Sequence, residues 1–367
     1  MDLELSDEQT WLSDSIETLL SRGWRAASDP PGDRRALWRS LVDFGGLTVG
    51  GDEGLGAVEL CLVSRALGAH LAEVPYLASA AVRFAIAPLG ASAPHAFARL
   101  AERDDAVALA LLEPGSGWDL AHPRTTIEEA AAGAVLNGRK AAVEHAQAAD
   151  LLAVLGAAPD GPALALVSTA AAGIRAAEQP AFDAGVPMHA VGFSDVRIGE
   201  GCVAGGAVAA EALGRLRAIG ALLAASEAVG AAGRLLDDAC RYAGERRQFG
   251  RPIGSFQALR HLLADMYVRQ ASSWSSVLYA AAALDEDTAA AARTASIAKA
   301  YVSRASRAVA HGAMQVFGGI AVTAEHPAHR FLRRILARGQ QFGDARHHER
   351  AIGRALARAP ERAGAFA

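Results

Sequence analysis

Apolar residues recur at helical spacing in the first part of the chain. Residues 6–9, Ser-Asp-Glu-Gln, are typical of a helix start, because acidic side chains favour the first turn of a helix. Apolar residues then follow at intervals that place them on one helix face, at Leu12, Ile16, Leu19 and Leu20. A glycine-rich segment at 50–56 interrupts the pattern and residues 58–71 resume it, so we predict helices over residues 1–105.

Short apolar runs replace this pattern between residues 106 and 205. The runs have the length of β-strands and lie at 107–112, 134–136, 151–155 and 163–167. Turn signals separate them, at Pro114-Gly115, Asn137-Gly138 and Pro159-Asp160-Gly161. This segment is therefore predicted to form a small β domain.

Long helical stretches follow from residue 206 onward, at 207–244, 256–283, 288–317 and 329–338. They are rich in Ala, Leu and Arg, which are strong helix formers. Long helices with short connections indicate a bundle. The sequence thus predicts a mostly α protein with a β middle domain, divided into residues 1–105, 106–205 and 206–367.

Composition adds limits on function. The 367 residues are 51% hydrophobic and carry a net charge of −4, so a large core is possible and no broad positive field would attract nucleic acid or an anionic membrane. The apolar stretch 218–232 carries Ser226 and Glu227 and is too short to span a bilayer. The acidic, amphipathic N-terminus is unlike a secretory signal. Three scattered cysteines fit a reducing compartment, so we predict a soluble cytoplasmic protein.

A basic turn between two predicted helices is the first candidate for chemistry. It spans residues 242–257, Y-A-G-E-R-R-Q-F-G-R-P-I-G-S-F-Q. A guanidinium here can pair with two phosphate oxygens, and Phe249 can stack on a flat ring. An ordinary helix–helix turn with solvated arginines explains the same residues equally well.

Gln315-Val-Phe-Gly-Gly319, at the end of another predicted helix, is the second candidate. Its two glycines allow a ligand to approach the backbone closely. A plain glycine cap at the end of a helix is the simpler explanation for this segment when it is taken alone.

Together the two segments resemble the C-terminal domain of the acyl-CoA dehydrogenase family. The shared pattern is Y-x-x-x-R-x-Q-F-G-x-P-I-x-x-F-Q, then Ala298-Lys299 in a helix, then Q-x-x-G-G-x-x-x-T-x-E-x-P. Weaker similarity covers the rest of the chain. Residues 38–47 look like the N-terminal helix and turn of the family, 111–119 like its T-E-P-x-x-G-S-D loop, 136–140 like its N-G-x-K strand, and 191–197 like the strand that leaves its β domain.

The resemblance implies an N-terminal helical domain, a β-barrel middle domain and a C-terminal four-helix bundle. It also implies that a base removes the α-proton of an acyl-CoA thioester while the β-hydride moves to FAD. In the family FAD lies between two subunits: one lines the flavin ring with the T-E-P loop and the strand after N-G-x-K, and the other holds the pyrophosphate and adenosine. The second set matches Arg246, Gln248, Phe249, Gln257, Gln315, Gly318 and Gly319.

The departures from the family pattern concern the flavin ring and the base. Leu112 replaces the Thr of T-E-P, Trp118 replaces the Ser before Asp, and Ala-Ala-Val at 141–143 replaces an aromatic-Ile-Thr/Ser run. These changes remove hydroxyl donors. Phe342 stands where the family has its usual catalytic Glu, and the alternative base position, near 220–221, holds Gly-Ala. None of these residues accepts a proton.

Glu227 is the one acid in the apolar stretch 218–232 of the predicted helix. It lies two helical turns from the alternative base position and so on the same face. It is therefore the candidate base, although a structural carboxylate paired with an arginine or a helix end is the more common role for such a residue. Asp344 is predicted to cap the following helix. The histidines near 326 and 347 lack zinc-like spacing, so no metal is predicted.

Three functions follow from these observations. The favoured one is a heteromeric acyl-CoA dehydrogenase in which this chain supplies phosphate-side FAD contacts to a homologous, Glu-bearing subunit. A homo-oligomeric dehydrogenase using Glu227 as base is the second, and a non-redox protein that keeps the fold for assembly or ligand binding is the third. The acyl group stays open.

Overall fold

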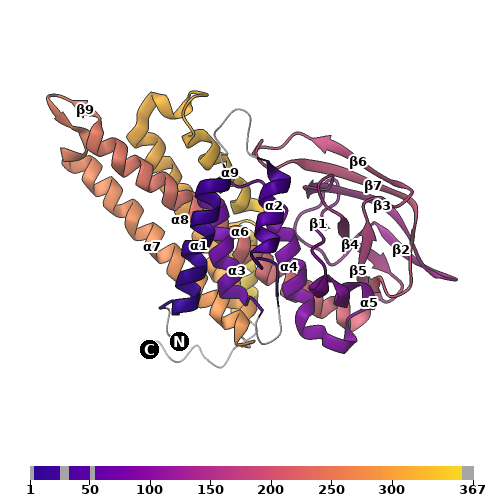
Figure 1. The fold of residues 1–367 in the computed structure, drawn as a ribbon. Coiled ribbons are helices and arrows are strands. Elements are labelled where there is room, and N and C mark those ends of the chain that lie inside the picture. The colour runs from indigo at the N-terminus through magenta and orange to yellow at the C-terminus, as the bar shows by residue number, and fades with distance from the viewer. Residues whose placement is uncertain (1–3, 25–32, 50–53, 289, 358–367) are drawn as a thin grey trace. The chain divides into compact units, whose positions relative to one another are not determined.

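The computed structural model describes residues 4–24, 33–49, 54–288 and 290–357. Packing divides the chain into two compact units (Figure 1). The first comprises Met1–Pro31, Ala57–Ala72 and Ala221–Ala367, and the second comprises Gly32–Gly56 and Glu73–Gly220.

The first unit is helical. Its elements are α1 (Asp7–Gly23), α3 (Ala57–Ala69), most of α6 (Gly206–Glu245), α7 (Gln257–Asp285), α8 (Ala291–Phe317), α9 (Ala328–Gln340) and α10 (Ala345–Ala357). Short pieces connect them: the hairpin β9 (Arg247–Gln248) and β10 (Arg251–Pro252), η3 (Ile253–Ser255) and η4 (Gly318–Val322). Helix α8 packs against α7, α9 and α10.

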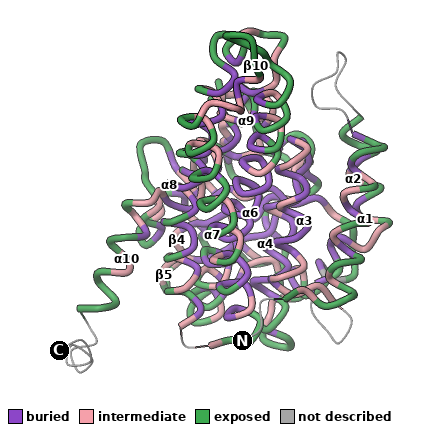
Figure 2. Tube along the Cα trace, turned by 90° about the vertical axis from the view of Figure 1, so that its left-hand side faces the viewer, coloured by how far each residue is buried: buried purple, intermediate pink, exposed green. Residues whose placement is uncertain are grey.

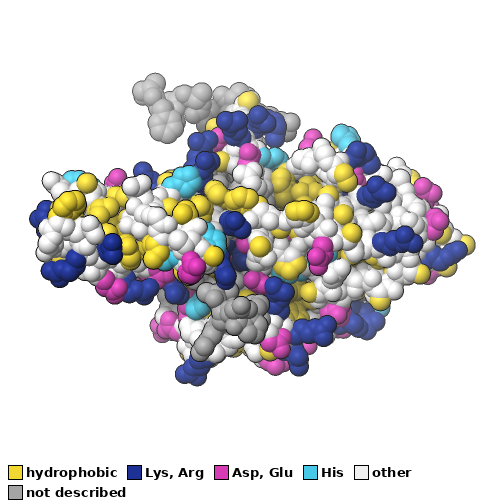
Figure 3. Space-filling view, turned by 90° about the horizontal axis from the view of Figure 1, so that it is seen from above, with side chains coloured by type: hydrophobic (Ala, Val, Ile, Leu, Met, Phe, Trp, Pro, Cys, Tyr) yellow, Lys and Arg dark blue, Asp and Glu magenta, His cyan; other side chains and the backbone are white. Residues whose placement is uncertain are grey.

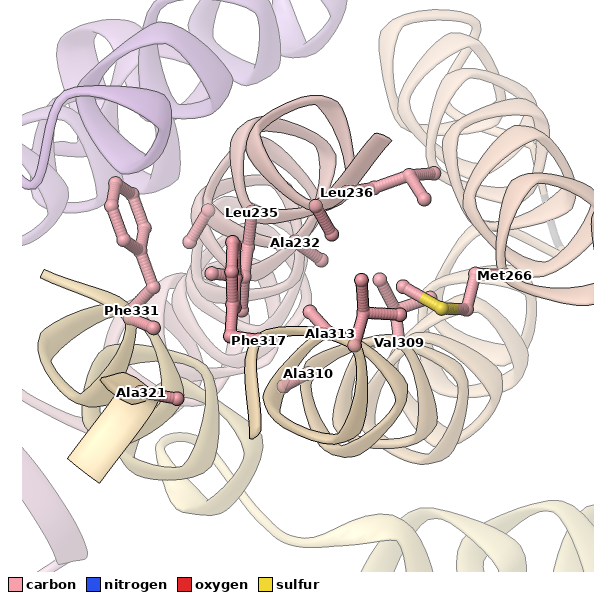
Figure 4. Packing of buried hydrophobic residues seen from close by; sticks show 14 of the residues in the cluster. Ala232, Leu235, Leu236, Met266, Val309, Ala310, Ala313, Phe317, Ala321 and Phe331 are labelled. Atoms are coloured by element: carbon pink, nitrogen blue, oxygen red, sulfur yellow. The ribbon is translucent and has the colours of Figure 1, made fainter. Parts of the chain in front are cut away.

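Small side chains let these helices approach closely. Figure 4 shows Ala232 of α6 and Ala310 and Ala313 of α8 between larger residues such as Phe317 and Phe331. The bundle predicted from the sequence is therefore present, with a core of alanine and leucine rather than of large aromatic residues.

Helices α3 and α6 touch backbone to backbone at two glycines. A β-carbon on Gly68 would overlap the carbonyl oxygen of Glu227, and one on Gly230 would overlap that of Arg65. Neither glycine has a positive φ, so close helix packing, and not turn geometry, requires them.

The second unit joins short helices to a sheet. The helices are α2 (Arg34–Asp43), α4 (Tyr76–Ile86), η1 (Ala87–Ser92), α5 (His95–Ala98) and η2 (Arg99–Glu102). The strands are β1 (Val107–Ala110), β2 (Thr126–Ala130), β3 (Gly133–Glu144), β4 (Leu151–Ala158), β5 (Gly161–Ser168), β6 (Ile174–Gln179), β7 (Met188–Ile198) and β8 (Val203–Ala204). They form one eight-stranded sheet in the order β6-β7-β3-β2-β4-β5-β8, with β1 parallel to β4.

The predicted fold class is confirmed. The helix start at residues 6–9 carries a capping box, in which Ser6 and Gln9 bond each other's backbone N–H. The predicted helices 207–244, 256–283, 288–317 and 329–338 agree with α6 to α9 within three residues at each end. The sequence did not predict β2 or β6, and it indicated α10 only through the predicted cap at Asp344.

Helix α6 corrects one detail of the sequence prediction. At 40 residues it is long and apolar enough to cross a membrane, although residues 218–232 alone are not. However, 89% of its most apolar 18-residue window is buried within the protein. Figure 2 shows mostly buried residues along α6. That burial is typical of the central helix of a folded core.

Candidate functional site

A two-residue hairpin presents the basic turn. Arg246 N donates to Tyr242 O and Ile253 N donates to Arg246 O, both at 2.8 Å, so the hairpin continues directly from α6. Phe249 and Gly250 form its turn with φ values of 50° and 79°. A left-handed conformation costs a bulky residue about 1–2 kcal/mol, so the fold holds Phe249 there against its own preference. The ring of Phe249 is 91% exposed.

Stacking at Phe256 supports this hairpin. The guanidinium of Arg251 lies 4.2 Å from the centre of the Phe256 ring, and the Phe249 ring meets Phe256 edge-on at 6.1 Å. Such contacts contribute roughly 0.5–1 kcal/mol each at exposed sites. The sequence analysis did not single out Arg251 or Phe256 as supports for Phe249.

The end of α8 lies beside the same hairpin. The Tyr242 and Phe317 rings are 5.4 Å apart, which joins the last turn of α6 to the last turn of α8. Phe256, which directly precedes α7, packs against the same core cluster. The seven predicted FAD-binding residues therefore gather at one end of the bundle, where Figure 2 shows exposed chain around β10.

The side chains in this set are free to bind a ligand. Those of Arg246, Gln248, Gln257 and Gln315 are exposed and make no hydrogen bond or ion pair within the described part of the chain. A β-carbon at Gly318, whose φ is 68°, would meet no atom within 4 Å. Figure 3 shows basic and hydrophobic side chains interspersed on the upper surface of the helical unit. Free donors and an accessible glycine backbone fit the phosphate and adenosine half of FAD.

In the second unit, the loop after β1 is held by one buried carboxylate. Glu113 accepts hydrogen bonds from Lys140 Nζ at 2.9 Å, from Thr125 N at 2.8 Å, and from the backbone and side chain of Arg124. Burial would raise the pKa of Glu113, but these donors outweigh it and hold the pKa below its ordinary range. Burial lowers the pKa of Lys140, and Glu113 opposes that shift. The Glu of the T-E-P-like loop and the Lys of N-G-x-K thus bind each other.

This loop keeps its shape but lacks hydroxyl donors at three places. Ala141 N donates to Leu112 O at 2.9 Å, so the loop stays paired with β3. The side chains of Leu112 and of residues 141–143 are aliphatic, and Trp118 replaces a hydroxyl residue. The fold therefore preserves the scaffold of the predicted flavin-ring side without its side-chain donors.

Glu227 is held by two arginines of α9. Arg334 Nη1 donates to one carboxylate oxygen and Arg338 Nε to the other, both at 2.8 Å. All three side chains are buried. A carboxylate whose two oxygens are both bonded to guanidinium groups is poorly placed to accept a proton from a substrate. The geometry therefore favours the structural role over that of a base.

A buried lysine adjoins this ion pair. Lys299 Nζ donates to Arg338 O at 2.6 Å. Burial, together with the positive charge of Arg338, lowers the pKa of Lys299 to about 7, although Asp344 acts in the opposite direction. Three basic side chains, Arg334, Arg338 and Lys299, thus lie together in the network around Glu227.

Phe342 occupies a fixed, buried position in the turn between α9 and α10. Its φ is 58°, and its carbonyl oxygen lies 3.1 Å from His348 Nε2. Arg338 Nη1 donates to the neighbouring Gln341 Oε1 at 2.7 Å. Asp344 accepts a hydrogen bond from His347 N at 2.8 Å at the start of α10, which confirms its predicted capping role. No proton acceptor stands at the usual base position.

His326, beside the last residue of α8, has a packing role. The His326 ring lies 4.6 Å from that of Phe317, and His326 Nδ1 accepts a hydrogen bond from Ala328 N. Among the described residues, no three His, Cys, Asp or Glu side chains are grouped so that they could hold a metal.

Comparison with known proteins agrees with this geometry. Residues 204–357 match the family model described as acyl-CoA dehydrogenase, C-terminal domain. Acyl-CoA dehydrogenase FadE27 of Mycobacterium tuberculosis is 30% identical over 343 residues, which cover 89% of this chain and 89% of that protein. Acyl-CoA dehydrogenase IpdE2 of Mycolicibacterium smegmatis is 42% identical over 132 residues, which make up 36% of this chain and 40% of that protein.

A solved structure extends the similarity to nearly the whole chain. One chain of the ChsE4–ChsE5 complex from Mycobacterium tuberculosis matches with a TM-score of 0.85 and 27% identity, covering 98% of this chain and 100% of that one. The chain belongs to the acyl-CoA dehydrogenase family of FAD-dependent oxidoreductases.

Proposed function

We propose that this chain is one subunit of a heteromeric acyl-CoA dehydrogenase and supplies the contacts to the pyrophosphate and adenosine half of FAD. The observation that carries the proposal is an asymmetry between two sets of residues. The phosphate-side set is complete, and its polar side chains are exposed and make no hydrogen bond or ion pair with any described residue. The ring-side loop and both base positions lack the polar groups that the reaction needs.

The two sets must come from different subunits if the site follows the family pattern. At a two-fold interface, a homodimer needs both sets intact in the same sequence. A heteromer needs only one set from each chain. The relative in the ChsE4–ChsE5 complex, which is an assembly of two differently named proteins, supports a homologous partner of this kind.

Within such an assembly the residues of this chain would bind and orient the pyrophosphate and adenosine half of FAD. Arg246 would neutralise phosphate charge, Gln248, Gln257 and Gln315 would donate to phosphate or adenosine, and Gly318 and Gly319 would let the ligand approach the backbone. When bound, FAD supplies the acceptor for the hydride that leaves the β-carbon of an acyl-CoA thioester. The partner would supply the base for the α-proton, since Phe342 cannot. We expect this assembly in the cytoplasm, because the three cysteines are all free.

Co-purification tests the assembly. The chain is expressed in its native host with an affinity tag, and the complex is analysed for partner identity, flavin stoichiometry and acyl-CoA oxidation. We expect a homologous partner with an intact T-E-P-x-x-G-S-D loop and a catalytic Glu, and fewer than one FAD per chain. A homo-oligomer with one FAD per chain that oxidises acyl-CoA would contradict the proposal and favour the homo-oligomeric alternative.

Arg246→Ala tests the phosphate side directly. Loss of a charged hydrogen bond to phosphate should weaken FAD retention by about 1–3 kcal/mol, which is roughly a 5- to 150-fold change in affinity. Flavin absorbance after desalting measures it. Arg293→Ala is the matched control, since Arg293 is an exposed, unpaired arginine at the opposite end of α8. Equal flavin content in both variants would remove Arg246 from the site.

A further inference from the structure

Three neighbouring strands of the second unit place two arginines in one row. Arg175 of β6 and Arg139 of β3 both lie opposite Gly192 of β7. Side chains of directly opposed residues point to the same face of a sheet. Both arginines are exposed, whereas the next residues along β7, Val191 and Phe193, are buried on the other face. The row Arg175–Gly192–Arg139 therefore faces solvent.

Neither arginine is neutralised by the protein. The side chains of Arg139 and Arg175 make no hydrogen bond or ion pair with any described residue. The acids on the same face belong to other rows: Asp195 accepts a hydrogen bond from Asn137 at 3.2 Å, and Glu144 lies near the other end of β3. Two strand spacings separate the arginines by roughly 9.6 Å at their α-carbons, which long side chains can bridge.

Gly192 is not required by the local structure. Its φ is not positive, and a β-carbon on it would meet no atom within 4 Å. Glycine weakens a strand interior, and its presence there often marks a place where a ligand approaches closely. Glycine therefore leaves open space above β7, in the row that holds Arg139 on one neighbouring strand and Arg175 on the other.

A neighbouring side chain shows that β6 residues can reach across β7. Gln179, two rows from Arg175 on the same face, accepts a hydrogen bond from Ala142 N of β3 at 2.9 Å through its Oε1. An arginine is longer than a glutamine. In the row between Arg175 and Gln179, Ala177 lies opposite Ala190, so only small side chains stand beside Gly192 on this face.

We propose that Arg139, Gly192 and Arg175 form a binding site for a phosphate group. Two guanidinium groups can each donate two hydrogen bonds to a phosphate dianion, one group from each side. The glycine between them allows the phosphate to lie close to the sheet. The phosphate is either the 3′-phosphate of coenzyme A or free inorganic phosphate. The coenzyme A source rests on the proposed function, because the site would then bind the coenzyme A part of the acyl-CoA substrate.

Calorimetric titration of the purified, full-length protein with its partner distinguishes these sources. The ligands are coenzyme A, dephospho-coenzyme A, which lacks the 3′-phosphate, and inorganic phosphate. For the coenzyme A source we expect at least about tenfold tighter binding of coenzyme A than of dephospho-coenzyme A. The double variant Arg139→Ala/Arg175→Ala should lose this preference. Gly192→Val should lose it too, because it fills the open space above β7 and leaves both charges in place.

Arg197→Ala, at another exposed arginine of β7, is the charge-matched control and should keep the preference. Binding of inorganic phosphate that depends on the two arginines, with no preference between the coenzymes, would support the site and identify the free ion as its ligand. Phosphate and coenzyme A titrations that are the same in the wild type and the double variant would overturn the proposal. Intact, arginine-dependent binding without acyl-CoA oxidation would count against the proposed function alone.

Discussion

Replacing Glu227 by Gln separates the two roles considered for this residue. The change keeps the volume of the side chain and removes its charge. If Glu227 is the ion-pair partner that the geometry favours, the variant should lose stability. If it is the base, the variant should keep its stability and flavin but lose turnover, since an amide cannot accept the α-proton.

The expected loss of stability follows from the burial of the network. Arg334 and Arg338 are both buried, and each donates to one Glu227 oxygen at 2.8 Å. Removing one partner of a buried ion pair leaves the other uncompensated, which typically costs about 3–5 kcal/mol. The amide NH2 would also face a guanidinium donor in place of an acceptor.

Urea unfolding of the variant and of Glu349→Gln gives the comparison. Glu349 pairs with Arg304 at 2.6 Å on the surface, where both side chains are largely exposed, so its loss should cost only about 0–1 kcal/mol. A midpoint for Glu227→Gln that drops well beyond the control would support the structural role. Wild-type stability together with a 10²- to 10⁴-fold loss of turnover, roughly the contribution of a general base, would refute this reasoning and make Glu227 the base.

Two further predictions concern the same helical unit. Gly68→Ala should destabilise the unit by about 1–3 kcal/mol, because a β-carbon there overlaps the Glu227 carbonyl oxygen. The control is Gly214→Ala, whose β-carbon would meet no atom and which should be neutral or slightly stabilising. Equal urea midpoints for the two variants would contradict the close helix contact. Lys299 has a pKa of about 7 in the folded protein and an ordinary value of 10.5, so the folded state holds fewer protons between these values and stability should rise with pH across this window. Relative to Lys299→Met, wild-type stability measured by urea unfolding from pH 7 to pH 10 should gain up to about 1.4 kcal/mol per pH unit, and parallel curves would show that Lys299 keeps an ordinary pKa.

Elements with a strong hydrophobic period could be predicted from the sequence, and those without one could not. Helices α6 to α8 bury long apolar faces and were predicted within a few residues. Strand β6 has no fully buried residue, and β2 buries only Ile127, so neither produces an apolar run. Helix α10 buries only His348 among its described side chains, so only the capping residue before it, Asp344, indicated this helix. Elements at the edge of a fold bury few residues, so their sequences show no apolar pattern that predicts them.

In the candidate site, too, residues in local motifs could be singled out from the sequence, whereas contacts between distant residues could not. The seven positions proposed to bind FAD could be singled out because they belong to motifs with fixed local spacing, and their role stays a prediction. The partners of Glu227 lie 107 and 111 residues away, and no local pattern identifies them. A buried acid requires a cation, so the sequence indicated that a partner existed without indicating which of many arginines it was.

The two halves of the predicted flavin site differ in what holds them. On the ring side, Glu113 and Lys140 are buried and satisfy each other, so they would keep the loop in shape whether or not a ligand binds. On the phosphate side, Phe249 is exposed in a left-handed conformation, and the side chain of Arg246 makes no hydrogen bond or ion pair with any residue that the structure describes. Backbone strain at an exposed hairpin does not stabilise this chain by itself, and such strain clusters where a ligand or partner is bound. The proposed function accounts for the strained phosphate-side hairpin, whereas the buried ion pair on the ring side is accounted for by folding alone. A subunit that completes the cofactor site of a neighbour should show this difference.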